Sequence, residues 1–171
     1  MSRGGIPVAG EVATVLNVEL DVVVPEALRS PECPELVYGA ITEDGIRALD
    51  VPMWRTLSAD PDKLARIESE AGDLARKEGR RLRGRGPVGR LDRRTAVIVD
   101  DCLEHGVLAW AACRSAFARG AVRTVVAAPV GTCAAVAMVA DHADNVVCPH
   151  VVTELPDPDR YFAWHSDRSI G

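Results

Sequence analysis

The sequence lacks the features that define several broad classes of protein. No apolar run approaches the ~20 residues that a membrane helix needs, and the start of the chain lacks the charged-then-apolar pattern of a signal peptide. Aromatic residues make up only 4% of the chain, and none is interleaved with a basic cluster, as single-strand nucleic-acid binding requires. A net charge of −5 provides no general attraction to nucleic acid or anionic lipid. We therefore expect neither a membrane nor a nucleic acid as partner.

Cysteine is present in a pattern that does not favour disulfide bonds. The five cysteines are odd in number and lie mostly within apolar patterns, in a chain without a signal pattern. Such thiols are typical of the reduced cytoplasm, so we expect a cytoplasmic protein. The 171 residues, 47% hydrophobic and 26% charged, fit one globular domain, 1–171, with a sizeable core.

The most informative stretch of the chain is Thr95 to Gly106. Five apolar or β-branched residues run into Asp100 and Asp101, and a short loop then leads to Gly106 and an expected helix over 107–119. The run is typical of a buried parallel strand, and we expect it to be the central one. Ligands of open α/β sheets bind at the carboxyl ends of such strands, which is where the two acids would lie.

The rest of the chain alternates strand and helix patterns, which predicts an α/β fold with a parallel sheet flanked by helices. An antiparallel flap is expected over about 25–55, and a tail over about 151–171. In the long helix, Leu74 is expected on the buried face, and Phe117 is expected in the core of the later helix. The other expected strands are 20–24, 122–128 and 146–148, and the other expected helices are 6–16, about 60–83 and 133–140.

This arrangement resembles the type I phosphoribosyltransferase family. Asp100, Asp101 and Gly106 match its signature, V-D-D-G-x-x-T-G-x-T. Residues 118–131 resemble the family's next strand. Residues 21–45 resemble the flap, and residues 3–9 the first loop, of a bacterial stand-alone subgroup. The resemblance implies the family's α/β fold with a small antiparallel flap, here with a short N-terminus.

The resemblance also implies roles for individual residues in binding phosphoribosyl pyrophosphate with Mg²⁺. Asp100 and Asp101 would be the catalytic pair that holds the two ribose hydroxyls, although Asp is also common in plain turns after strands. The residues that would face the pyrophosphate are Arg3, Gly4 and Gly5. Those that would hold the 5′-phosphate are His105, Gly106, Val107 and Leu108.

The expected phosphate cradle departs from the family signature at several positions. Cys102 stands where the family has a flexible glycine, and His105 and Leu108 stand where it has two threonines. Glu104 adds a negative charge that repels phosphate, whereas a protonated His105 would compensate in part. The signature is therefore degenerate at the loop that should bind the anion.

The flap departs from the subgroup in the same direction. Glu26 and Ala27 occupy the place of adjacent Arg and Lys residues that would neutralise pyrophosphate. Arg29 is close in sequence, but its register along the strand is wrong for that role. Eight basic residues between Lys77 and Arg94 are expected mainly to be a solvated helix end, with some reaching the active site.

These features leave three functional interpretations open. The first is a protein that binds a ribose phosphate, as phosphoribosyl pyrophosphate or a nucleotide, and transfers the phosphoribosyl group to a base. The second is a catalytically impaired relative that acts as a nucleotide-binding regulator or partner subunit. The third is altered chemistry, or a zinc site on the same fold made by Cys102, His105, Cys148 and His150.

The beginning of the chain carries one further expectation. The family usually has a helix and a strand before the R-G-G loop, whereas this chain starts at Met1. A sheet edge left uncovered in this way invites pairing with another strand. We therefore expect a homodimer or a partner subunit.

Overall fold

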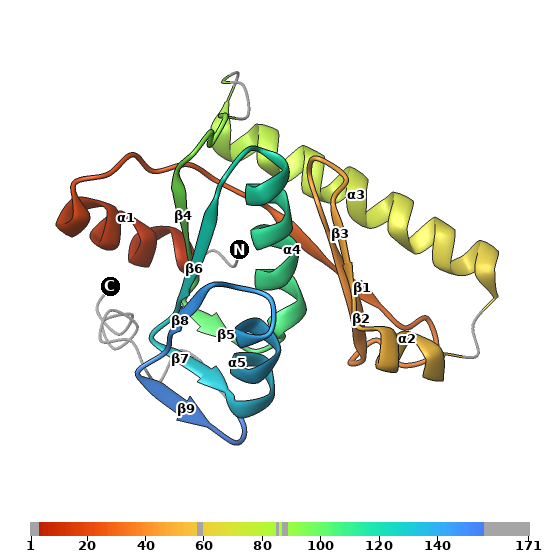
Figure 1. Ribbon diagram of the computed structural model, residues 1–171. Helices are drawn as coiled ribbons and strands as arrows, with labels where there is room; N and C mark the ends of the chain where they lie inside the picture. Colours follow the sequence, from red (N-terminus) through yellow and green to blue (C-terminus); the bar gives the residue numbers. More distant parts are fainter. Residues whose placement is uncertain (1–3, 58–59, 85, 87–88, 156–171) are drawn as a thin grey trace, which may run out of the picture.

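The structure is a computed structural model that describes residues 4–57, 60–84, 86 and 89–155. Its helices and strands form a mixed α/β arrangement, in which parallel sheets are flanked by helices and a small antiparallel sheet stands to one side (Figure 1). The helices are α1 (Gly5–Leu16), α2 (Val51–Thr56), α3 (Pro61–Arg83), α4 (Gly106–Ala118) and α5 (Cys133–Ala140). The strands are β1 (Pro25–Arg29), β2 (Val37–Thr42), β3 (Arg47–Leu49), β4 (Thr95–Val99), β5 (Cys102–Leu103), β6 (Arg123–Ala127), β7 (Val130–Thr132), β8 (Asn145–Val147) and β9 (His150–Val152).

Two parallel sheets follow one another along the same three chain segments. The first has the order β4-β6-β8 and the second the order β5-β7-β9. Each segment therefore crosses from one sheet to the other, at 100–101, 128–129 and 148–149 respectively. The second sheet was not expected from the sequence, because its two- and three-residue strands are too short to show a pattern.

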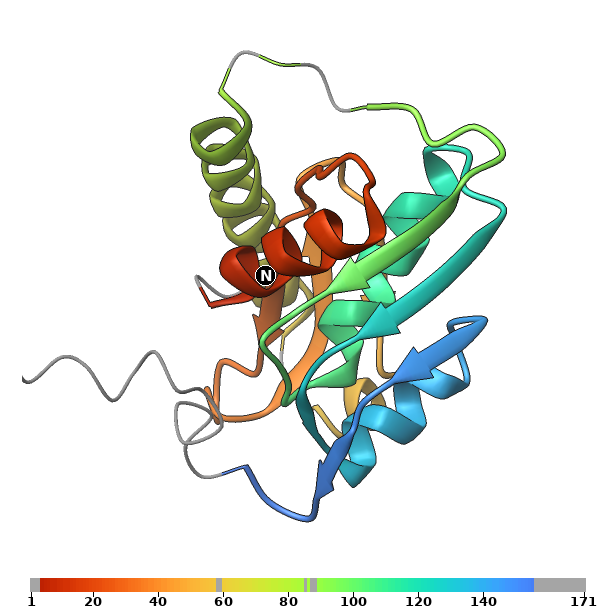
Figure 2. The ribbon, with the colours of Figure 1, turned by 90° about the vertical axis from the view of Figure 1, so that its left-hand side faces the viewer.

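The strand over 95–99 is confirmed, but its expected central position is wrong. Within the described residues β4 lies at an edge of its sheet, and β6 is the central strand. Helices α1 and α4 lie on opposite sides of this sheet (Figures 1 and 2). Ala96 and Ala116 belong to one core cluster on the α4 side, whereas Val99 lines a hollow with Val8 and Val12 of α1. The expected homodimer or partner subunit stays a prediction.

The antiparallel flap is confirmed as the sheet β1-β2-β3, but the separate strand expected before it, over 20–24, is wrong. Residues 20–24 are not a strand, and β1 follows them. Side chains satisfy their backbone instead: Glu43 accepts a hydrogen bond from the Val24 N–H (2.6 Å), and Arg83 donates one to the Val22 carbonyl (2.6 Å). The apolar run thus reflects burial of single residues rather than strand pairing.

Helix starts were predicted well because capping is local. Asp60 accepts a hydrogen bond from the Asp62 N–H at the start of α3, and Thr132 accepts one from the Ala135 N–H at the start of α5. The short helix α2 was missed, although Asp50 caps it through the Met53 N–H (3.0 Å). Within the described residues, no helix is both long and apolar enough to cross a membrane.

Two expectations about the core are wrong. Leu74 is 54% exposed and Phe117 is 42% exposed, although both lie on apolar stripes of their helices. Ile67 and Ala71 of α3 do pack against the flap, and Cys113 of α4 is buried as expected. The flap covers only part of the apolar stripe of α3, which leaves Leu74 at the wall of an open groove.

Candidate functional site

The two acids lie at the carboxyl end of β4, where strand pairing is about to stop. The Asp100 N–H still donates to the Ala127 carbonyl of β6 (3.0 Å). The Asp100 carboxylate accepts a hydrogen bond from the Asp101 N–H (3.0 Å), and the Asp101 carboxylate accepts one from the Cys102 N–H (3.0 Å). Each acid therefore fixes the turn that follows it, which holds the pair in one orientation.

The pKa of Asp100 is the most displaced of any carboxyl in the described residues. Burial, together with the neighbouring Asp101 carboxyl, raises the pKa of Asp100 to about 7. Two close carboxyls that are short of solvent tend to share a proton, because both cannot ionise at low cost. Near neutral pH the pair can thus both accept and donate a hydrogen bond.

The first loop of the chain meets this pair directly. A Cβ added to Gly4 would lie 2.0 Å from Asp101 Oδ2, so that a larger residue here would have to displace the Asp101 carboxyl. Gly5 is the first residue of α1 and is buried. Arg3 lies outside the described residues, and its expected role stays a prediction. The structure therefore brings Gly4 and Asp101, which are remote in sequence, into contact.

A pocket of about 140 Å³ opens beside the acid pair. Its walls combine the end of β4, the loop before α4, the start of α4 and one strand of the flap. His105 and Leu108 line it as the sequence predicted, whereas Gly106 and Val107 are buried and do not line it. The lining residues are Ala27, Arg29, Asp100, Asp101, Cys102, Leu103, Glu104, His105, Leu108 and Ala109.

The loop between the acids and α4 is more ordered than the sequence indicated. Cys102 and Leu103 form β5 and pair with Val130 and Gly131 of β7. Among the described non-glycine residues, only Asn17 and Arg93 have positive φ, so Cys102 occupies an ordinary backbone conformation. The family signature has glycine at this position, but the conformation of this loop does not require one.

The thiol of Cys102 has the electrostatic environment that its neighbours predicted. Burial, followed by the charges of Asp101, Asp100 and Glu104, raises the pKa of Cys102 to about 12. A thiol that stays protonated is a poor nucleophile and a poor metal ligand. Among the described residues, no group of three or more His, Cys, Asp or Glu side chains is placed to hold a metal ion. The zinc alternative with Cys148 and His150 therefore finds no support in the geometry.

Arg29 is the site residue that sequence reasoning dismissed. The pairing of β1 with β2 shifts between Leu28, which faces Gly39, and Arg29, which faces Val37. The extra residue, Tyr38, lies in β2, and Arg29 lines the acid-pair pocket together with Ala27, two residues earlier on the same strand. The Arg29 guanidinium donates to the Pro34 carbonyl (3.0 Å). A role of Arg29 in binding an anion stays a prediction.

The basic residues between Lys77 and Arg94 behave mainly as a solvated, ion-paired surface. Arg81 pairs with Glu78 (2.6 Å) and Arg90 pairs with Asp92 (2.6 Å), and both of these pairs are exposed. None of the described members of this group lines the acid-pair pocket. Arg85 lies outside the described residues.

One member of this group, Arg83, enters a buried ion-pair cluster, which we call the Arg83 cluster (Arg83, Glu43, Asp21 and Arg119). Arg83 pairs with Glu43 and, at 3.5 Å, with Asp21, and Asp21 pairs with Arg119 at the end of α4. Only 12%, 7% and 11% of the Arg83, Glu43 and Arg119 side chains are exposed. Burial acts to raise the pKa of Asp21, but hydrogen bonds from the Val22 N–H and Arg119 outweigh it, so the pKa is lowered.

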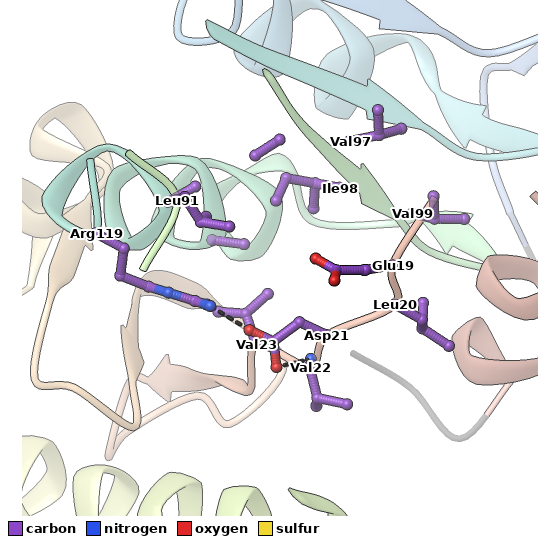
Figure 3. Close-up of a pocket in the computed structure, with 13 residues that line it drawn as sticks. Glu19, Leu20, Asp21, Val22, Val23, Leu91, Val97, Ile98, Val99 and Arg119 are labelled. Atoms are coloured by element: carbon purple, nitrogen blue, oxygen red, sulfur yellow. Dashed lines mark hydrogen bonds and ion pairs between the residues drawn. The ribbon is translucent and has the colours of Figure 1, made fainter. Parts of the chain in front are cut away.

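The Arg83 cluster anchors the segment after α1 beside the edge strand β4. Figure 3 shows Arg119 reaching across to Asp21, with Ile98 of β4 on the same side of the strand. This hollow has a volume of about 120 Å³. Its walls are largely apolar, and its one anchored acid is already paired, so the acid-pair pocket is the better candidate for ligand chemistry.

Comparison with known proteins identifies relatives of the chain. No protein-family model matches the chain. It is 42% identical over 164 residues, or 95% of its length, to proteins from two Mycobacterium tuberculosis strains (CDC 1551/Oshkosh and H37Rv), each named a "putative phosphoribosyl transferase". The chain spans about a third (35%) of the length of these relatives.

A solved structure covers nearly the same part of the chain. The crystal structure of TT1426 from Thermus thermophilus matches with a TM-score of 0.75 and 35% identity, over 94% of this chain and 76% of that protein. The chain belongs to the same family as TT1426 and is a homologue of the mycobacterial phosphoribosyl transferase-like proteins.

Proposed function

We propose that this protein has the type I phosphoribosyltransferase fold, binds a ribose phosphate at the acid-pair pocket, and transfers the phosphoribosyl group from phosphoribosyl pyrophosphate to a nitrogen base. The observation that carries the proposal is one small pocket lined by the acid pair, His105 and Arg29, with Gly4 packed against Asp101. These residues come from three separate parts of the sequence. The names of the mycobacterial relatives agree with this assignment.

Asp100 and Asp101 are proposed to hold the two ribose hydroxyls. A carboxylate accepts two hydrogen bonds in one plane, which suits a vicinal diol. The hydrogen bonds from the Asp101 and Cys102 N–H groups keep the carboxyls oriented before the ligand arrives. Pre-orientation of this kind lowers the entropic cost of bringing the reacting atoms together.

The anionic groups of the ligand are proposed to lie on either side of the diol. His105 precedes α4, whose free N–H groups and dipole favour a 5′-phosphate, although Gly106 and Val107 are themselves buried. Arg29 and the loop of Arg3, Gly4 and Gly5 would serve the pyrophosphate.

Magnesium is proposed to accompany the pyrophosphate. The described residues form no metal site of three or more side chains. Asp100 and Asp101 are carboxylates at the pocket, and a cation there would take its other ligands from phosphate oxygens and water. When bound, Mg²⁺ would neutralise charge on the leaving group.

The reaction exchanges one bond at the anomeric carbon. A lone pair of the base nitrogen forms the new C–N bond, the C–O bond to pyrophosphate breaks, and pyrophosphate leaves with the electron pair. The base nitrogen then loses its proton. The residues proposed here bind and orient the sugar and stabilise the charge of the leaving group, which is the main need of this chemistry.

A second candidate function has its own supporting observation. Three carboxyl groups, those of Asp100, Asp101 and Glu104, line the pocket beside Arg29 and His105. This balance disfavours a ligand with as many negative charges as phosphoribosyl pyrophosphate. A nucleotide-binding regulator, which would need to hold only one phosphate, is therefore the alternative.

Calorimetric titration separates these functions. We expect phosphoribosyl pyrophosphate with Mg²⁺ to bind with micromolar affinity, and Asp101→Asn to weaken it at least about tenfold, or about 1.4 kcal/mol. Asp92→Asn, at an exposed acid away from the pocket, is the control and should bind like the wild type. Binding of a nucleoside monophosphate alone would favour the regulator. Failure of both ligands to bind, or equal binding by Asp101→Asn, would overturn the proposed site.

A further inference from the structure

A wide groove of about 580 Å³ lies between the outer edge of β1 and α3. Its volume falls within the roughly 300–1,000 Å³ of typical small-molecule sites. It adjoins the acid-pair pocket, because Ala27, Arg29 and Leu108 line both. We infer that this groove binds the acceptor of the proposed reaction, and that the acceptor is a flat nitrogen heterocycle that carries amino groups rather than a carboxylate.

The inner wall of the groove suits the face of an aromatic ring. Ile67, Ala71 and Leu74 lie along one side of α3, and Leu108 of α4 closes the end next to the acid-pair pocket. Leu74 is 54% exposed and lies at the wall of the groove. A planar ring laid against this wall would remove that apolar surface from water, which is favourable in proportion to its area.

The polar groups of the groove favour hydrogen-bond donors. Glu26 and Glu70 line it, and Arg29, at the junction with the acid-pair pocket, is the one cation among its lining residues. Glu70 has an ion pair with Arg66, but at 3.6 Å and with both side chains more than 60% exposed (72% and 67%) this pair is weak. Two carboxylates can accept hydrogen bonds from amino groups, whereas they repel a ligand that is itself a carboxylate.

Arg29 separates the two hollows chemically. It lines both of them, and its guanidinium is held by the Pro34 carbonyl (3.0 Å). Arg29 would therefore face the phosphate groups of the donor, and the groove beyond it keeps its acidic character for the acceptor. The nitrogen nucleophile and the sugar would thus approach from adjoining sides.

This inference rests on the proposed function, and its test separates the two. Adenine, which carries an amino group, is titrated calorimetrically against nicotinate and orotate, which carry a carboxylate, each with and without phosphoribosyl pyrophosphate and Mg²⁺. We expect adenine to bind at least about tenfold more tightly than either carboxylate, a difference of about 1.4 kcal/mol.

Two variants of α3 form a matched pair for this test. Glu70→Lys reverses one charge in the groove and should lower the preference for adenine at least tenfold. Asp73→Lys makes the same change of charge on the same helix, but Asp73 is not among the residues that line the groove, so the preference should be kept. Leu74→Ser should weaken adenine without changing the binding of phosphoribosyl pyrophosphate.

The outcomes distinguish the two hypotheses. Equal binding of the three ligands, or the same response of Glu70→Lys and Asp73→Lys, would overturn the groove as the acceptor site, even where phosphoribosyl pyrophosphate binds normally. Absence of phosphoribosyl pyrophosphate binding would instead overturn the donor site. The preference of the groove would then still be read from the titrations without the donor.

Discussion

The two ends of α4 handle buried charge in opposite ways. At its start, two like charges, Asp100 and Asp101, lie together, and the pKa of Asp100 is raised to about 7. At its end, Asp21 is matched by Arg119 and Arg83, and the pKa of Asp21 is lowered. Matched charges stabilise the fold, whereas like charges held together cost stability and supply chemistry. The contrast indicates which end of the helix serves function.

The largest effect should come from breaking the ion pairs at the end of α4. Arg83→Ala would leave Glu43, whose side chain is only 7% exposed, without its partner, and Asp21 with one fewer. Removal of one member of a buried ion pair typically costs about 3–5 kcal/mol of unfolding free energy. Urea denaturation would measure the loss.

The control for this change is an ion pair on the surface of the same helix. Arg81→Ala breaks a pair with Glu78 in which the side chains are 57% and 39% exposed. Such pairs contribute about 0–1 kcal/mol. If the two variants lost the same stability, the Arg83 cluster would not be the anchor described here.

An intermediate effect should come from crowding the acid pair, Asp100 and Asp101. Gly4→Ala places a methyl group 2.0 Å from Asp101 Oδ2 and must displace that carboxyl. We expect a loss of about 1–3 kcal/mol in stability and weaker binding of phosphoribosyl pyrophosphate, measured by thermal unfolding and calorimetry.

Gly10→Ala is the matched control for Gly4→Ala. An added Cβ at Gly10 meets nothing within 4 Å, and the residue lies inside α1. There alanine should stabilise the helix by about 0.5–1 kcal/mol and leave ligand binding unchanged. Intact binding by Gly4→Ala would show that Asp101 does not need its present orientation.

The smallest effect should be on the pH dependence of stability, to which Asp100 and Asp21 should contribute with opposite signs. Because the folded pKa of Asp100 is raised, its contribution is most favourable below its ordinary pKa of 3.8 and is lost as the pH rises towards about 7. Because the folded pKa of Asp21 is lowered, its contribution is present above pH 3.8 and is lost as the pH falls further.

Unfolding free energies measured across pH 3–8 would test this pair of signs. Asp100→Asn should gain stability relative to the wild type as the pH rises from about 4 to about 7. Asp21→Asn should be less stable than the wild type above about pH 4, and this deficit should shrink as the pH falls towards 3. If the unfolding free energy of both variants depended on pH in the same way as that of the wild type, Asp100 and Asp21 would not contribute with opposite signs.

What could be predicted from the sequence was mainly local. The acids after β4, the starts of α3 and α5, and the antiparallel flap all depend on a few neighbouring residues. The raised pKa of the Cys102 thiol could also be foreseen, because Glu104 and the acid pair are adjacent in sequence.

What could not be predicted depends on pairing between distant segments. The place of Arg29 beside the acid pair follows from the packing of β1 near the loop before α4, and the contact of Gly4 with Asp101 follows from the packing of the first loop. The edge position of β4 and the exposure of Leu74 likewise depend on which neighbours are present. Patterns of apolar residues report burial, but not the element that provides it.

The crossing of three chain segments between the two parallel sheets has a mechanical consequence. The two sheets meet along one line of junction residues, and the strands on both sides of this line are paired in register. The junction residues are Asp100–Asp101, Ala128–Pro129 and Cys148–Pro149. Backbone hydrogen bonds also connect neighbouring segments at this junction. The Asp100 N–H donates to the Ala127 carbonyl, and the Ala128 N–H donates to the Val147 carbonyl. A change in the angle of one segment would therefore move the other two. The orientation of Asp100 and Asp101 thus depends on the angle between the two sheets as well as on their own turn.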